Sequence, residues 1–272
     1  MALTVNTNVA SLNAQRNLST SQLDLNKSLQ RLSSGLRINS AADDAAGLAI
    51  SEGMKAQIRS MNQAVRNAND GVSMVQVAEG ALNEVSNILG RMRELATQAA
   101  TGTVAQSQRE YINSEFGRLA SEITRIASAT AFNGIHMLAG ATTTTIQVGT
   151  GNGGFNEISI TTASMDADSL GITGGINSSD AAKAMLDTLD AAISTVSSSR
   201  ANLGAAQNRF QSVINNLQVA AENTSAAQSR IADADIAAET AAMTRANILV
   251  QAGTSILAQA NQAPQAALSL LR

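Results

Sequence analysis

Three glycines in the middle of the chain have the spacing of a nucleotide-binding loop. Gly149, Gly151 and Gly154 satisfy the pattern GxGxxG, in which the backbone approaches the phosphates of a dinucleotide. Such a loop needs a strand before it and a helix after it, because the helix N-terminus binds the phosphates. Segment 142–148 has the β-branched residues of a strand, but so has segment 155–162. The glycines therefore predict the loop of a β-hairpin, and no cofactor is expected.

The remaining side chains with catalytic chemistry are few. His136 is the single histidine and the chain has no cysteine, which excludes paired-histidine metal sites, thiolate catalysis and disulfides. Asp43 and Asp44 are neighbours, but adjacent residues of a helix point about 100° apart, which does not suit an acid and base pair. We interpret both as helix-capping or joint residues. The sequence predicts no enzyme and no metal site.

The longest helical pattern runs from Ser40 to about Ala100. Ser40 is the predicted N-cap, while Asp43 and Asp44 place negative charge at the positive end of the helix. At about 1.5 Å per residue this helix is roughly 90 Å long, so an elongated molecule is expected. Apolar side chains recur along it at steps of four and three: Met54, Ile58, Met61, Val65, Ala68, Val72 and Val75, then Leu82 and Leu89.

Two later segments repeat this helical period. After residues 101–103 one apolar face is formed by Ile112, Phe116, Leu119, Ile123 and Ile126. From Asp180 onward a heptad is formed by Ile193, Val196, Leu203, Phe210, Ile214, Leu217 and Ala221. The fold class expected is mainly α, an elongated antiparallel bundle or coiled coil of long helices with a small β-hairpin region at 142–162.

The two ends of the chain carry narrow apolar stripes. The N-terminal stripe comprises Val5, Val9, Leu12, Leu25, Leu29, Leu32 and Leu36, and the C-terminal one comprises Ile248, Leu249, Ile256, Leu257, Leu268, Leu270 and Leu271. A single helix with so narrow a stripe is marginal in water, so we expect the N- and C-terminal helices to pair. Pro264 should kink or end the last helix near Ala263.

Composition limits the class of protein further. The apolar fraction of 44% suffices for a core, but aromatic residues make up only 2%, which favours thin helix packing over a globular enzyme. A net charge of -3 does not suggest a nucleic-acid surface. Neither a run of 18 apolar residues nor the apolar core of a signal peptide is present, so we expect no membrane insertion and, if the protein is secreted, another export route.

Two long motifs are similar to those of a known family. The sequence SSGLRINSAADDAAGLAIS at 33–51 and the ending ILVQAGTSILAQANQAPQAALSLLR closely resemble bacterial flagellins. The likeness covers nearly the whole chain except roughly residues 141–178, where this family often has large outer domains. The resemblance implies a minimal flagellin: a structural subunit that polymerises into the extracellular flagellar filament for swimming motility, after export in an unfolded state through the flagellar type III system.

The same resemblance implies a domain division and partners. Residues 1–40 and 234–272 would form an inner terminal coiled-coil domain that folds during assembly. Residues 41–140 and 179–233 would form the outer helical rod, with 141–178 as a short variable β-hairpin region. The implied partners are further copies of the chain in a helical homopolymer, a flagellar export chaperone, the filament cap protein and the hook-filament junction protein.

A possible innate immune receptor site is also implied by the resemblance. It maps to Arg91, Leu95 and Glu115, whose alternative role is plain assembly contact. Among other functions, a hook-filament junction protein would share the coiled ends, although the LAQANQAP and LSLLR segments favour a filament subunit. A secreted coiled-coil effector or adhesin would explain the helices but not both motifs.

Overall fold

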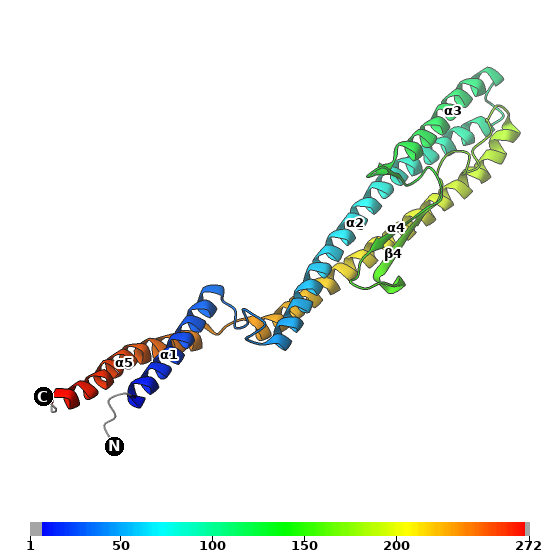
Figure 1. The fold of residues 1–272 in the computed structure, drawn as a ribbon. Helices are drawn as coiled ribbons and strands as arrows, with labels where there is room; N and C mark the ends of the chain where they lie inside the picture. Colours follow the sequence, from blue (N-terminus) through cyan, green and yellow to red (C-terminus); the bar gives the residue numbers. More distant parts are fainter. Residues whose placement is uncertain (1–6, 270–272) are drawn as a thin grey trace. The chain divides into compact units, whose positions relative to one another are not determined.

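The structure is a computed structural model that describes residues 7–269, with side chains described up to residue 262. The chain forms two compact units: a terminal unit from residues 1–56 and 223–272, and a central unit from residues 57–222. The elements in order are α1 Val9–Ser34, α2 Ala45–Ala100, α3 Gln106–Ala129, β1 Ala131–Phe132, β2 Ile135–His136, β3 Thr142–Gln147, the 3-10 turn η1 Gly154–Asn156, β4 Glu157–Thr162, α4 Ser179–Ala232 and α5 Ile236–Ser269 (Figure 1).

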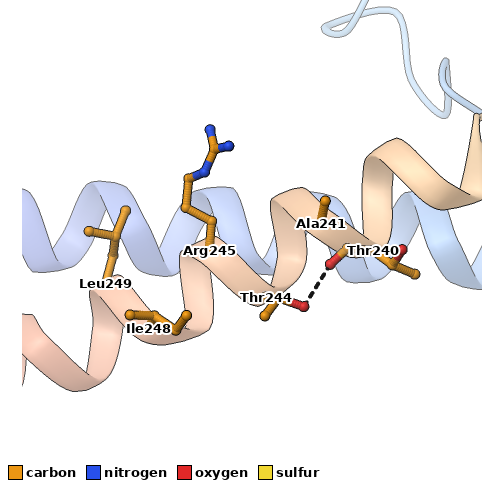
Figure 2. Close-up of a pocket in the computed structure, with 6 residues that line it drawn as sticks. All are labelled: Thr240, Ala241, Thr244, Arg245, Ile248 and Leu249. Atoms are coloured by element: carbon orange, nitrogen blue, oxygen red, sulfur yellow. Dashed lines mark hydrogen bonds between the residues drawn. The ribbon is translucent and has the colours of Figure 1, made fainter.

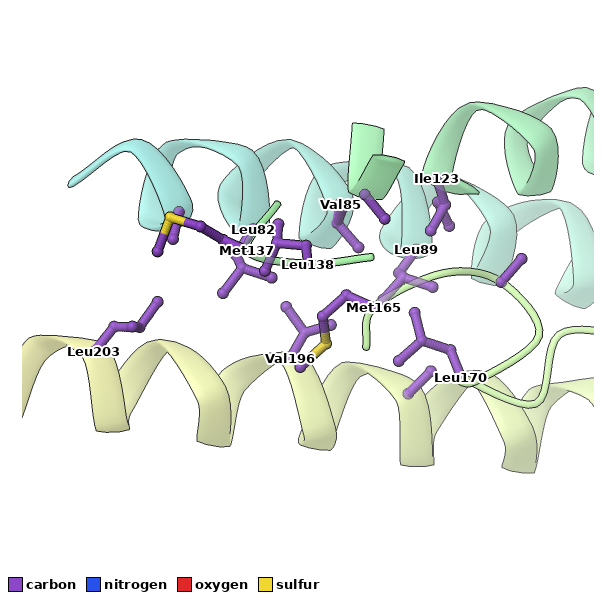
Figure 3. Packing of buried hydrophobic residues seen from close by; sticks show 14 of the residues in the cluster. Leu82, Val85, Leu89, Ile123, Met137, Leu138, Met165, Leu170, Val196 and Leu203 are labelled. Carbon is purple, nitrogen blue, oxygen red and sulfur yellow. The ribbon is translucent and has the colours of Figure 1, made fainter. Parts of the chain in front are cut away.

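The core of the central unit is a layer of side chains between long helices. Within this unit α3 and α4 lie alongside α2 (Figure 1). Leu82 and Leu89 of α2 face Val196 and Leu203 of α4 across the core, and Ile123 joins them from α3 (Figure 3). All of these side chains are almost completely buried. The predicted helical periods, and with them the mainly α fold class, are confirmed.

The hairpin covers part of this core. Strands β3 and β4 pair antiparallel, from Thr142 opposite Thr162 to Gln147 opposite Glu157. Alternate residues of β4, including Ile158 and Ile160, are buried, which is the period-two pattern of a sheet with one solvated face. The glycine-rich loop leads into η1 and β4 rather than into an α-helix. It is therefore the hairpin loop that the sequence predicts.

The start of α2 differs from the expectation. The helix begins at Ala45, and the Asp44 carboxylate accepts a hydrogen bond from the Gly47 N–H at 2.8 Å, as an N-cap residue does. Ser40 lies in the preceding turn, where its N–H and hydroxyl donate to Asp43 Oδ2 at 3.2 and 3.1 Å. The prediction of Ser40 as N-cap is wrong. Ser40 and Asp43 instead close the preceding turn, and Asp44 is the acid that accepts a hydrogen bond from an N–H group in the first turn of the helix.

The last helix also departs from the prediction. Helix α5 continues through Pro264 to Ser269. Of the two predicted effects of Pro264, a kink or an end of the helix near Ala263, the end is wrong. Proline removes one backbone hydrogen bond, but the surrounding alanines are the strongest helix formers and sustain the helix on both sides. No helix within the described residues contains a stretch long and apolar enough to cross a membrane.

Candidate functional site

The terminal unit consists mainly of the paired helices α1 and α5, which lie side by side in antiparallel orientation (Figure 1). At one end the Asn8 side-chain amide donates to the Ala260 carbonyl at 2.7 Å. Toward the other end Arg31 Nη1 lies 3.6 Å from Glu239 Oε2. The predicted pairing of the N- and C-terminal helices is confirmed.

The interface between these two helices is narrow. Leu25 of α1 and Ala246 of α5 are buried, and so is Ser28. A Cβ atom placed on Gly253 would lie 3.2 Å from Leu18 Cδ1, so the glycine lets α1 approach α5 closely. Small residues at the contact shorten the distance between the helices, but they also leave few large side chains to bury.

Most of the large apolar side chains of the pair therefore face outward. Val9 is 69% exposed and Ile248 is 60% exposed. We call this set the terminal apolar surface; its members are Val9, Leu12, Leu23, Leu29, Ile236, Ile248, Leu249 and Ile256. So many large exposed apolar side chains on a single pair of helices are typical of a site of association. The terminal unit thus has the surface of a protein that binds another protein.

The side chains expected at the ends divide between the helix interface and this surface. Leu25 is buried, while Leu32, Leu36 and Leu257 are half-buried. The exposed ones are Val9, Leu12, Leu29, Ile248, Leu249 and Ile256. Val5, Leu270 and Leu271 lie outside the described residues, as does the Leu268 side chain. The sequence reasoning missed Leu23, although three helical turns separate it from Leu12 and place both on one face.

Part of the terminal apolar surface is a shallow groove of about 570 Å³ on α5. Ala241, Ile248 and Leu249 supply its apolar lining, and Arg245 extends from its middle away from the helix backbone (Figure 2). Thr244 donates its hydroxyl hydrogen to the Thr240 carbonyl at 2.8 Å, so that hydroxyl is satisfied within the helix. A groove on one helix with apolar walls and one cation suits the side chains of another helix.

The segment that joins α1 to α2 is held by an acid that the sequence singled out. Asp43 Oδ1 lies 3.0 Å from Lys27 Nζ on α1. Asp43 Oδ2 accepts hydrogen bonds from the N–H groups of Asn39 and Ser40. The hydrogen bond from Lys27, followed by those from Ser40 and Asn39, lowers the pKa of Asp43 to about 2. Asp43 therefore connects the joint segment to α1 as an ionised carboxylate.

A second connection crosses between the two chain segments of the joint. The Arg37 N–H donates to the Ala232 carbonyl at 2.7 Å, and the Ala234 N–H donates to the Gly35 carbonyl at 2.9 Å. The Arg37 guanidinium also donates to the Ile231 carbonyl. Gly35 has φ +71°, a left-handed conformation that favours glycine and ends α1. Hydrogen bonds between the segment after α1 and the segment after α4 thus order the joint.

The residues expected at an immune receptor site lie on the central unit. Arg91 Nη2 is 3.0 Å from Glu115 Oε1, so the structure brings α2 and α3 together at this point. Hydrogen bonds with Glu94 and Glu115 raise the pKa of Arg91. Leu95 is only 2% exposed and belongs to the core. Of the three residues, only Arg91 and Glu115 are accessible to a partner.

Residues 7–262 contain no group of three or more histidine, cysteine, aspartate or glutamate side chains arranged to hold a metal ion. Asp43 orders the segment between α1 and α2, and Asp44 is the N-cap residue of α2. The main feature of the described residues is the solvent-exposed terminal apolar surface.

The comparisons with known proteins agree with this description. Residues 5–143 match the family described as bacterial flagellin N-terminal helical region, and residues 186–271 match the bacterial flagellin C-terminal helical region. A flagellin of Halalkalibacterium halodurans is 46% identical over 270 residues, covering 98% of this chain and 99% of that protein. A flagellin of Bacillus subtilis is 43% identical over 302 residues, with coverage of 98% and 99%.

Solved structures show similar folds. The crystal structure of Bacillus cereus flagellin has 32% sequence identity and a TM-score of 0.50, covering 56% of this chain and 88% of that chain. A putative flagellar hook-associated protein from Vibrio parahaemolyticus has a TM-score of 0.59 over 70% of this chain and 100% of that chain. Its identity of 14% shows similarity of fold alone.

Proposed function

Since the chain belongs to the bacterial flagellin family, we propose that it is a structural subunit that polymerises into the extracellular flagellar filament used for swimming. The family is one of structural proteins, not enzymes. A relative from Treponema phagedenis, named a flagellar filament 33 kDa core protein, is 43% identical over 284 residues, covering 98% of this chain and 99% of that protein.

The observation that carries this proposal is the terminal apolar surface on α1 and α5. A helix pair that exposes more large apolar side chains than it buries gains little free energy by folding alone. Contact with neighbouring copies removes the same side chains from water. Polymerisation therefore supplies the burial that the isolated terminal unit lacks.

This reasoning supports a functional division of the chain. Residues 1–40 and 234–272 would be the inner domain, which becomes stably helical as a subunit docks. Residues 41–233 would be the outer part, whose core is complete within one copy. Coupling the order of the ends to docking would keep free subunits from polymerising early, and it would suit export of the unfolded chain through a narrow channel.

The finer partners follow from the family and are part of the proposal. An export chaperone would cover the exposed C-terminal helix before secretion, and the filament cap protein and hook-filament junction protein would meet the subunit at the two ends of the filament. An innate immune receptor would contact Arg91 and Glu115 from outside, with Leu95 supporting them from the core.

The test of the proposal is seeded growth. Purified full-length protein is mixed with short filament seeds while light scattering and circular dichroism are recorded together. We expect scattering to rise and helical signal to increase with it, because α1 and α5 become ordered on docking.

Two results would argue against the proposal. A protein that is already fully helical and does not respond to seeds would point to the junction protein or to a secreted soluble coiled coil. Growth without any gain of helix would preserve the filament assignment but contradict folding on docking.

A further inference from the structure

The glycine-rich loop between β3 and β4 contains a residue pair that can react with itself. Asn152 is followed by Gly153, and the chain has one other asparagine before a glycine, Asn133 before Gly134. In such a pair the glycine nitrogen attacks the side-chain amide of the asparagine, since glycine has no Cβ atom to hinder the approach. Asparagine is for this reason a thermolabile residue. The two pairs differ in how firmly the backbone holds them.

Asn133 and Gly134 are the two central residues of a tight turn. Their φ angles are 49° and 80°, and Phe132 pairs with Ile135 across the turn. Positive φ at both central residues is the requirement of a type I′ hairpin turn. The Met137 side chain, which follows the second strand of this hairpin, is fully buried and anchors it. Attack by the Gly134 nitrogen needs a rotation of the peptide after Asn133 that breaks this turn.

The peptide group that joins Asn152 to Gly153 is held on either side but not itself. Before it, Gln147 Nε2 donates to the Gly151 carbonyl at 2.9 Å, and after it the Asn156 N–H donates to the Gly153 carbonyl at 2.9 Å. Among the described residues no hydrogen bond reaches the Asn152 carbonyl, its side chain or the Gly153 N–H. Asn152 is exposed and has glycine on both sides, so this peptide group is free to rotate toward the side-chain amide.

We propose that Asn152 is a site of hydrolytic deamidation, with water as the co-reactant. The Gly153 nitrogen forms a bond to Asn152 Cγ, the bond from Cγ to the amide nitrogen breaks, and the backbone N–H proton leaves with that nitrogen as ammonia. Water then adds to one carbonyl carbon of the cyclic imide. Its hydroxyl group completes a carboxyl group, and its other hydrogen returns to the Gly153 nitrogen as the imide bond breaks. No oxidant or reductant takes part.

Two products follow from the two carbonyl groups of the imide. Opening at Cγ gives aspartate at position 152, whereas opening at the main-chain carbonyl gives isoaspartate, in which the main chain passes through the side-chain CH₂ group. Either product adds one negative charge to a chain whose net charge is -3. Because the reaction needs only water and the folded loop, the acidic form increases with the age of the chain, and the inference is independent of the proposed function.

Peptide mapping after incubation tests the site. Full-length protein is kept in mildly alkaline buffer made with heavy-oxygen water, digested at acidic pH and analysed by mass spectrometry with fragmentation that separates aspartate from isoaspartate. We expect Asn152 to lose its amide at least about tenfold faster than Asn133, whose turn must first open. The new carboxyl group at 152 should contain heavy oxygen. In urea the two asparagines should react at similar rates, because the fold no longer distinguishes them.

Two variants assign the change of charge to one position. In isoelectric focusing, the Asn152→Ser chain should lack the acidic band that appears early in the unmodified protein. The Asn133→Gly chain keeps a residue that adopts positive φ without strain, so the early band should be unchanged.

Several results would overturn the inference. Equal rates at the two positions in the folded chain would do so, as would survival of Asn152 in the folded chain while the chain in urea reacts. A tenfold difference that persists in urea would show that local sequence, not the fold, selects Asn152. An early acidic band in the Asn152→Ser chain would place the reaction elsewhere. Failure of the unmodified chain to extend seeds would instead refute the proposed function and leave the deamidation result standing.

Discussion

Asp43 illustrates how one side chain orders a segment of backbone. Its carboxylate joins Lys27 of α1 to the N–H groups of Asn39 and Ser40. Because the pKa of Asp43 is about 2 instead of 3.8, ionisation stabilises the folded joint at pH above about 4. That contribution decreases below pH 4 and is lost as the pH falls through about 2.

We therefore predict that acid loosens the joint in assembled filaments. Hydrogen exchange of the peptide 36–44, measured by mass spectrometry between pH 6 and 2 and corrected for the intrinsic rate at each pH, should show protection that falls below pH 4. In an Asp43→Asn filament the protection should be weak throughout. Protection that is equal in both filaments at pH 6 would mean that the carboxylate does not order the joint.

Gly71 shows a different constraint, that of a crowded core position. A Cβ atom there would lie 2.8 Å from Phe210 Cζ, and the Phe210 ring is fully buried and has little room to move. We predict that Gly71→Ala destabilises the central unit by about 1–3 kcal/mol in urea denaturation, as overpacking does. Gly80 lies on the same helix with open space around it, so Gly80→Ala should stabilise by up to about 1 kcal/mol. Equal effects of the two substitutions would contradict this account.

At the scale of elements, apolar packing between helices outweighs the ion pairs that join them. Leu89 is fully buried between α2 and α4, whereas the Arg93–Asp190 pair bridges the same helices at 2.6 Å in an exposed position. Water and salt screen exposed pairs, so their net contribution to stability is small even at short distances.

This comparison gives a prediction for the central unit. Leu89→Ala should lower the free energy of unfolding by about 2–5 kcal/mol, because it leaves a cavity in a closely packed layer. Arg93→Ala should barely change the midpoint of urea denaturation, and added salt should affect the unmodified chain equally little. A larger effect of Arg93→Ala than of Leu89→Ala would show that the ion pair dominates.

The elements also show which features a sequence can predict. The stripe along α2 and the heptad along α4 are local patterns, and the Thr-rich alternation of β3 is visible without any structure, so these elements were predictable. The N-cap of α2 was not, because two adjacent acids compete and the geometry of the turn selects Asp44. The exposure of Leu23 and the place of Arg245 in the groove on α5 depend on how α1 packs on α5, which periodicity alone does not give.

At the scale of the whole molecule, the two units obtain their stability from different sources. The central unit has its own apolar core, which includes Leu82, Phe116 and Phe210. The terminal unit depends on the pairing of α1 with α5 and exposes much of its apolar surface. Removal of α5 should therefore affect the two units unequally.

We predict that a chain lacking residues 236–272 keeps a folded central unit but does not polymerise. Without α5, α1 loses the helix against which Leu25 is buried, and an isolated helix of its length is marginal in water. Circular dichroism should show cooperative unfolding of the retained core at nearly the normal temperature, while light scattering with seeds stays flat. Because α2, α3 and α4 bury their apolar faces on one another, loss of the cooperative transition would show that the core is not self-sufficient. Filament growth by the truncated chain would show that assembly does not require the paired ends.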